Sequence, residues 1–356
     1  MEKQTIWGNT LLLLGSVLFC LMLFGIGEVL TRQLSNVTFF GNSRNLFAAG
    51  SYGVSHGNAK NVQAVSFGTE VFTDRNGFRV PKHRSASQEA PKQKALFILG
   101  DSVGFGPGLR ESETFAGMLR SRFPDREIYN SSVIGYSTHD YRNVVDSFQF
   151  AQERVDQVFL VFCLNDISHA STREIERLIN PRTAPRVQRD ESNESGSFVD
   201  FLKNQPIFRN LNESLRSNSK LYLLLKGELT DPQARYWLAD YRSYLAPDQA
   251  PFLESMQDIR TIADKLRHQD IAFTVIISPY EYQLRNPDES ILIPQNRVRD
   301  YLTKHAIDTI DSTPWFIREH APSKTFFLAY DPMHLSAKGH EIIYKIMVDR
   351  IEAPGM

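Results

Sequence analysis

Hydrophobic residues follow three different patterns along the chain. Residues 11–26 are apolar or small and carry no charge. Residues 31–94 are mainly polar, but residues 64–67 and 70–73 alternate like short strands. After residue 95, short apolar runs alternate with segments whose apolar residues recur at helical spacing. These patterns predict an N-terminal apolar helix, a linker with a small irregular β-rich cap over 31–94, and a larger α/β domain over 95–354.

The α/β region alternates strand with helix. Its strand-like apolar runs are residues 95–99, 128–130, 158–162, 271–277 and 307–310. Its helical patterns are residues 113–123, 138–153, 259–268 and 298–305, with a last helix that Ser336 can cap. The run 158–162 is apolar throughout, as in a parallel strand covered on both faces. The alternation predicts a parallel sheet with helices on both faces.

An insertion interrupts this repeat over residues 171–250. Residues 172–218 are polar with little periodicity, whereas residues 221–225 and 236–244 are more apolar and aromatic. We interpret the segment as an inserted subdomain of helices and loops, and a mobile loop is the alternative. Because ligands bind at the carboxyl edge of a parallel sheet, an insertion beside that edge can form a lid or a substrate surface.

The N-terminal apolar run is long enough to cross a membrane. With the apolar residues on either side, it reaches the ~20 residues of a spanning helix. No small-x-small cleavage site follows it, and bulky Phe19 fits a lipoprotein cleavage box at Cys20 poorly. We predict an uncleaved transmembrane anchor over residues 1–30, the alternatives being a cleaved signal peptide and a buried helix. Flanking charges do not orient it, so a periplasmic or extracellular position of the domain is expected only from this layout.

The composition narrows the classes of function. Of the 356 residues, 42% are hydrophobic and 23% are charged, as in a globular protein. The formal net charge of −1 disfavours nucleic acid as a partner, because phosphate-binding domains carry a basic excess. Cys20 lies in the apolar run and Cys163 in a predicted strand, so we expect no disulfide.

Chemically versatile residues gather where the predicted strands end. A Gly-Asp-Ser sequence ending at Ser102 follows the first strand, Gly135 lies after the second, and Asn165 follows the third. Asp331 and His334 precede the last helix. Because ligands bind at the carboxyl ends of an open parallel sheet, the topology brings these segments to one crevice.

Ser102, His334 and Asp331 are the residue types of an activated serine nucleophile. A neutral hydroxyl needs a base within hydrogen-bond reach. His334 can take the serine proton and return it to a leaving group, while Asp331 orients and stabilises the imidazole. The structural alternatives are an N-cap role for Ser102, a surface position for His334, and a turn-capping role for Asn165.

These segments resemble the sequence blocks of the SGNH, or GDSL, hydrolase superfamily. The match runs in the family's order from residue 95 to the C-terminus, apart from the insertion. Residues 73–79 are also similar to a segment of membrane-anchored bacterial members. One departure is Cys163, which stands where the third block often has glycine.

The resemblance implies a three-layer α/β/α, flavodoxin-like fold with a central parallel sheet, preceded here by one transmembrane helix. It also assigns three oxyanion donors: the backbone N–H groups of Ser102 and Gly135 and the side-chain amide of Asn165. Losing one such donor typically lowers turnover by ~10²–10³-fold.

Other residues are expected to be structural. Arg79 is predicted to form a salt bridge that packs the cap onto the sheet, with anion binding as the alternative. His139, His169 and His340 are expected to be packed or solvated, and His169 is the best candidate among them for a substrate contact. Aromatic residues in 236–244 fit a packing stripe better than a sugar-stacking surface. We expect no cofactor and no metal, because the histidines lack metal-ligand spacing.

These residues favour a serine esterase that removes an acyl group, with acetyl as the first candidate, from a carbohydrate or small ester. An O-acyltransferase that modifies a surface or exported polysaccharide would use the same acyl-enzyme. A non-catalytic glycan-binding protein on the same fold is the third possibility. The substrate itself and protein partners cannot be read from the sequence.

Overall fold

The computed structural model describes residues 2–50, 52–82, 94–167, 205–245 and 250–353. The chain forms two compact units, which are treated separately below. Unit 1 comprises Met1–Gly41 and Asp190–Asp231, and unit 2 comprises Asn42–Arg189 and Pro232–Met356. Predicted features in residues 83–93 and 168–204, His169 among them, lie outside the described part of the chain.

Unit 2 is built on a sheet of eight strands in the order β10-β9-β8-β6-β7-β5-β4-β3. The five parallel strands are β6 (Lys94–Gly100), β7 (Arg126–Asn130), β8 (Val155–Cys163), β9 (Ala272–Ser278) and β10 (Asp308–Asp311). The last six residues of β8 are all buried, as expected for a strand covered on both faces. The predicted α/β fold with a central parallel sheet is therefore confirmed.

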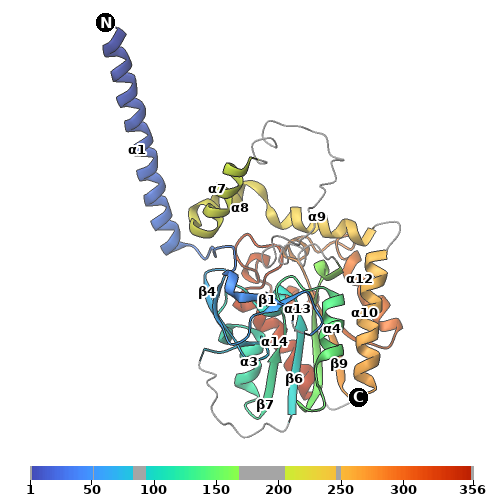
Figure 1. The fold of residues 1–356 in the computed structure, drawn as a ribbon. Coiled ribbons are helices and arrows are strands. Elements are labelled where there is room, and N and C mark those ends of the chain that lie inside the picture. The colour runs from blue at the N-terminus through green and yellow to red at the C-terminus, as the bar shows by residue number, and fades with distance from the viewer. Residues whose placement is uncertain (1, 51, 83–93, 168–204, 246–249, 354–356) are drawn as a thin grey trace. The chain divides into compact units, whose positions relative to one another are not determined.

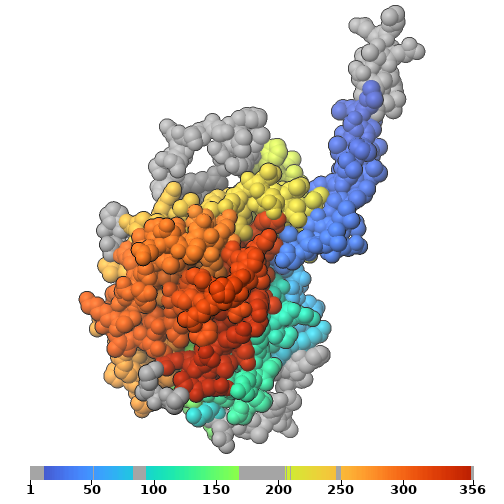
Figure 2. All heavy atoms as spheres, turned by 180° about the vertical axis from the view of Figure 1, so that it is seen from behind, coloured from blue at the N-terminus to red at the C-terminus, as the bar shows by residue number. Residues whose placement is uncertain are grey.

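Helices cover both faces of this sheet (Figure 1). The connections from β6 to β7 and from β7 to β8 run in opposite directions across the sheet. Right-handed crossovers therefore place α3 (Phe115–Arg122) and α4 (Thr138–Ser147) on opposite faces. Helix α4 packs against α10 (Ala250–Arg267), which also contacts α12 (Ile293–Lys304), and α3 packs against α14 (Ala337–Glu352). From behind, the red α14 region adjoins the teal of α3 (Figure 2).

The remaining helices of unit 2 are short or lie near the helix layers. They are α2 (Ser102–Phe105), α9 (Pro232–Leu245), α11 (Glu281–Arg285) and α13 (Thr313–Arg318), and the 3-10 turns are Arg44–Leu46, Glu111–Glu113, Leu164–Ile167 and Ser323–Thr325. Ser336 caps α14 as predicted, accepting a hydrogen bond from the Gly339 amide. Helix α4 ends at Ser147, earlier than the predicted residue 153, because Phe148 and Phe150 turn into the core against Phe97.

Residues 42–82 extend the sheet. Strands β3 (Gln63–Ser66), β4 (Thr69–Thr73) and β5 (Arg79–Val80) pair antiparallel and join the parallel part through β7. A second, two-stranded sheet pairs β1 (Phe47–Ala49) with β2 (His56–Asn58).

The turn before β5 fixes where its side chains point. The Asp74 carboxylate accepts hydrogen bonds from the Asn76 and Phe78 amides, and Gly77 takes a φ of +82°. A Cβ on Gly77 would lie 2.5 Å from the Asn58 carbonyl oxygen. After this turn, Phe78 packs in the core against Phe97, and Arg79 is buried next to the end of α2.

Unit 1 joins the N-terminal helix to part of the insertion. Helix α1 (Glu2–Leu34) contains Leu12–Leu34, the one stretch within the described residues that is long and apolar enough to cross a membrane. Helices α7 (Pro206–Asn218) and α8 (Lys220–Thr230) form a hairpin that packs against the last turns of α1. The insertion is thus helical over these residues, including 206–218, where the sequence showed little periodicity.

Candidate active site

Ser102 is held at the junction between the central strand and a short helix. Strand β6 ends at Gly100, and Asp101 caps α2 by accepting a hydrogen bond from the Val103 amide at 2.8 Å. Ser102 is the first residue of this helix and is only 6% exposed. A Cβ on Gly104 would lie 2.3 Å from the Ser132 hydroxyl, so the glycine allows α2 to sit against the loop after β7.

A continuous hydrogen-bond chain runs from Ser102 through His334 to Asp331. The distance from His334 Nε2 to Ser102 Oγ is 2.8 Å, and that from His334 Nδ1 to Asp331 Oδ2 is 2.7 Å. The other Asp331 oxygen accepts from the amides of Met333 and His334, which fixes the carboxylate. With Nδ1 protonated toward Asp331, Nε2 is the acceptor that faces the hydroxyl.

The surroundings of His334 act on its basicity in opposite directions. Burial alone would lower the pKa of the imidazole, whereas the carboxylates of Asp331 and, more weakly, Asp101 favour its charged form. The balance raises the pKa of His334 above the usual 6.5. The ring of Phe67, from the turn between β3 and β4, stands edge-on to the imidazole at 5.3 Å between ring centres. The geometry suits a base that takes up a proton during reaction.

Besides Ser102, the predicted oxyanion donors lie just after the two strands that flank β6. Asn165 follows β8, and its side-chain amide donates to Asp101 at 3.2 Å, which brings it next to Ser102. Gly135 is buried in the loop after β7 with a φ of +85°. That loop is tied to the end of β6, because the Val133 amide donates to the Gly100 carbonyl. All three predicted segments therefore meet at the end of the central strand.

Two buried carboxyl groups lie next to each other close to Ser102. Asp101 and Asp166 are both fully buried, and burial raises the pKa of each. The negative potential of Asp101 further raises the pKa of Asp166. Asp166 accepts a hydrogen bond from the Cys163 amide at 2.9 Å, so it fixes the turn that presents Asn165.

The partners of Arg79 differ from the predicted salt bridge. Its guanidinium is 1% exposed and donates to the carbonyls of Phe105, Gly106 and Leu109, with 2.5 Å to Gly106. The partners are backbone carbonyls at the end of α2 rather than the expected carboxylate. Arg79 therefore holds the loop that follows the nucleophile helix, a role that the sequence analysis missed.

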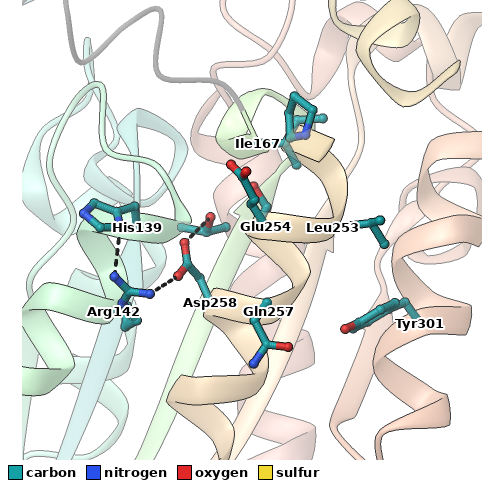
Figure 3. A pocket seen from close by; sticks show the side chains of 11 residues that line it. His139, Arg142, Ile167, Leu253, Glu254, Gln257, Asp258 and Tyr301 are labelled. Carbon is teal, nitrogen blue, oxygen red and sulfur yellow. Dashed lines mark hydrogen bonds and ion pairs between the residues drawn. The ribbon is translucent and has the colours of Figure 1, made fainter. Parts of the chain in front are cut away.

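A pocket of about 640 Å³ opens between α4, α10 and α12. Thr138 and Ile167 at its rim follow Gly135 and Asn165 by three and two residues. Arg142 bridges Asp258 at 2.7 Å and lies 3.2 Å from His139 Nδ1 (Figure 3). The lining combines polar and charged side chains with the apolar Ile167, Pro251 and Leu253, and Tyr301 lies at one side. None of the three predicted catalytic residues lines it.

The other histidines and aromatics have structural surroundings. His340 is fully buried, its Nδ1 accepts from the Phe115 amide, and burial lowers its pKa to about 3. Trp237 and Tyr244 of α9 are buried in the core, as a packing stripe predicts, whereas Tyr236 is 44% exposed and lies outside that stripe. Over the described ranges, no group of three or more histidine, cysteine, aspartate or glutamate residues is placed to hold a metal ion.

No family model matches the chain, and no curated protein matches it. Solved structures to which it is similar include the lipase/acylhydrolase from Enterococcus faecalis (13% identity, TM-score 0.39, covering 72% of this chain and 95% of that chain). Others are a member of the lipolytic protein G-D-S-L family from Veillonella parvula (10%, 0.38, 73% and 100%) and a catalytic mutant of Axe2, an acetylxylan esterase from Geobacillus stearothermophilus (13%, 0.41, 75% and 98%). The G-D-S-L family is the one that the sequence blocks resemble.

Replacing Arg79 should destabilise the fold through the nucleophile loop. Arg79→Met should lower the free energy of unfolding by at least about 3 kcal/mol, because three carbonyls lose their donor at roughly 1–3 kcal/mol each. The matched control is Arg75→Met on the exposed side of the same turn, which should change stability by less than about 0.5 kcal/mol. Equal denaturant midpoints for the two variants would contradict the role given to Arg79.

Proposed function

We propose that this protein is a serine-dependent esterase that removes an acyl group, acetyl being the first candidate, through an acyl-enzyme. The observation that carries the proposal is the hydrogen-bond chain Ser102–His334–Asp331 at 2.8 and 2.7 Å. Such a chain is what a neutral hydroxyl needs to become a nucleophile at neutral pH.

The steps follow from this geometry. The Ser102 hydroxyl gives its proton to His334 Nε2 while Oγ bonds to the ester carbonyl carbon. The tetrahedral oxyanion takes hydrogen bonds from the Ser102 and Gly135 amides and the Asn165 side chain. When the bond to the leaving alcohol breaks, His334 returns the proton to it, and the acyl group stays on Ser102. Water then enters, loses a proton to His334 Nε2, and its oxygen bonds to the acyl carbon. As the bond to Ser102 Oγ breaks, His334 returns that proton to Oγ, which releases the acid and restores the free serine.

Carbohydrate esters are the substrate class that we favour. The pocket beside the two oxyanion segments offers three hydroxyl groups, an amide, two carboxylates and a guanidinium, which suit a molecule with many hydroxyl groups. Helix α1 is apolar over Leu12–Leu34, and we propose that it is an uncleaved anchor with unit 2 on the periplasmic or extracellular side. Acylated glycans at a cell surface would then be within reach.

Removal of the nucleophile should abolish ester cleavage. Ser102→Ala should lower turnover of 4-nitrophenyl acetate by at least ~10³-fold, because Ser102 supplies the hydroxyl that is hydrogen-bonded to His334 Nε2. The same substitution should abolish covalent labelling by a fluorophosphonate, detected by intact mass. Ser131→Ala, a nearby buried serine bonded to the Ile98 carbonyl, is the control that keeps labelling. A wild-type protein that neither labels nor cleaves would instead favour the non-catalytic glycan-binding alternative.

The rate should fall in acid as His334 becomes protonated. Because the base must be neutral and its pKa is raised, kcat/KM should drop as the pH falls through a value above 6.5. Asp331→Asn removes the carboxylate that favours the imidazolium, so the acidic limb should move to lower pH while kcat falls by about 10⁴-fold. His268→Gln, at the exposed end of α10, should leave the limb in place. If Asp331→Asn leaves the acidic limb of the pH profile of kcat/KM at the same pH, His334 is excluded as the titrating base.

Transfer to a sugar hydroxyl is the second candidate. The observation that favours it is burial, because Ser102 is 6% exposed and the His334 side chain 15% exposed, which limits the access of water. With an acetyl donor and an added glycan, transfer predicts that acetylated glycan accumulates faster than free acetate. Acetate release unaffected by the glycan would support hydrolysis. Both products can be followed by mass spectrometry.

A further inference from the structure

The end of the N-terminal helix is bonded to the helical hairpin of the insertion. Glu28 accepts hydrogen bonds from the Ser219 hydroxyl at 2.8 Å and from the Lys220 and Leu221 amides at 3.1 and 3.0 Å. These groups form the start of α8, so a carboxylate of α1 caps another helix. Arg32, paired with Glu28 at 2.7 Å, donates to the Asn218 carbonyl at the end of α7.

Packing around this pair is close. A Cβ on Gly27 would lie 2.8 Å from a Leu221 methyl group, so the glycine lets α8 approach α1. Thr31, one turn later on the same side of α1, is 8% exposed. The contacts fix the hairpin to the last two turns of α1 and would be lost if α1 were cleaved off.

The position of Glu28 and Arg32 along α1 indicates the depth of the hairpin relative to a membrane. The candidate span has 23 residues, which at ~1.5 Å per residue is enough to cross a hydrocarbon core of ~30 Å. Charged groups are costly at the centre of a bilayer and stable at its surface. Glu28 and Arg32 lie near the C-terminal end of the span, so they and the hairpin belong at the headgroup level.

The hairpin exposes apolar side chains on both helices. On α7, Ile207 and Leu211 are one turn apart and 73% and 53% exposed. On α8, Leu225 and Leu229 are one turn apart and 49% and 84% exposed. Large exposed residues at helical spacing indicate a surface that contacts something apolar.

Basic and aromatic residues accompany this surface. Lys220 stacks over Phe39 and Arg216 over Phe40, both in the segment that leaves α1. Long cationic side chains next to exposed apolar ones are typical of helices that lie in a membrane interface, where cations meet lipid phosphates. The hairpin packs against the last turns of α1, at the end of the candidate membrane span, which favours lipid over a protein partner as the occupant.

We propose that α1, α7 and α8 form one membrane-bound unit, in which the exposed apolar face of the hairpin lies in the lipid interface. The partner is the bilayer surface, held through Ile207, Leu211, Leu225 and Leu229. This inference rests on the anchoring of α1 proposed above. It adds that α1 is retained because it caps the hairpin, and that the hairpin makes a second contact with the membrane.

Spin-label depth measurements on the full chain in phosphatidylcholine and phosphatidylglycerol vesicles test the proposal. Labels are placed singly at Leu211→Cys, Leu229→Cys and, as the matched control, Glu213→Cys, in a Cys20→Ser background where Cys163 is buried. Labels at 211 and 229 should collide more with oxygen than with a water-soluble nickel chelate. The label at 213, an exposed polar position on α7, should show the reverse.

A second set of labels tests the pair that holds the hairpin. Adding Glu28→Ala and Arg32→Ala should remove the lipid contact of the label at 211, because α8 loses its cap. A label on native Cys20 of α1 should stay deep in the bilayer in both proteins. Circular dichroism melting confirms that each variant is folded.

The outcomes separate this proposal from that of the anchor. Equal nickel collision at 211 and 213, with Cys20 deep, would overturn the hairpin contact and leave the anchor in place. Protection of 211 from both reagents would overturn it in favour of a protein cover, such as unit 2 or a second copy. A Cys20 label exposed to the nickel chelate would overturn the anchor itself.

Discussion

The arrangement of the candidate site depends on the hydrogen bonds that the Asp101 carboxylate accepts. One oxygen accepts a hydrogen bond from the Val103 amide at the start of α2. The other accepts from the Asn165 amide at 3.2 Å and lies 3.2 Å from Ser102 Oγ. It therefore joins the end of β6 to the end of β8. Its complete burial is costly for a charge, and these donors offset that cost.

The sheet brings the predicted catalytic residues together from distant parts of the chain. Ser102 and His334 are 232 positions apart, yet their distance is set by β6 at the middle of the sheet and by the start of α14 beside α3. Arg79 donates hydrogen bonds to carbonyls at the end of α2, and Asp101 accepts one from an amide at its start. A helix of only four residues is too short to be stable alone, so these two side chains set its position.

The sequence predicted the parts of the fold that leave a local pattern. All five parallel strands and the last helix agree with their apolar runs and cap, and the structure brings Ser102, His334 and Asp331 together as the motif spacing suggested. The role of Arg79 was not predictable, because its partners are backbone carbonyls, which every residue has. Strands β3 to β5 looked like a separate cap, since short antiparallel strands do not show in their own sequence which sheet they join. Helix α7 was missed although Ile207, Leu211 and Leu215 recur at helical spacing, because polar residues outnumber this stripe over residues 206–218.

The contacts of α1 within unit 1 go beyond what a membrane span alone requires. Part of the insertion belongs to the same unit as α1. Glu28 accepts hydrogen bonds from the first residues of α8, and Arg32 donates to the last carbonyl of α7, so both ends of the α7–α8 connection are bonded to α1. A signal peptide that is removed from the mature protein cannot serve as a lasting partner of a hairpin. These contacts therefore favour α1 as a permanent part of unit 1.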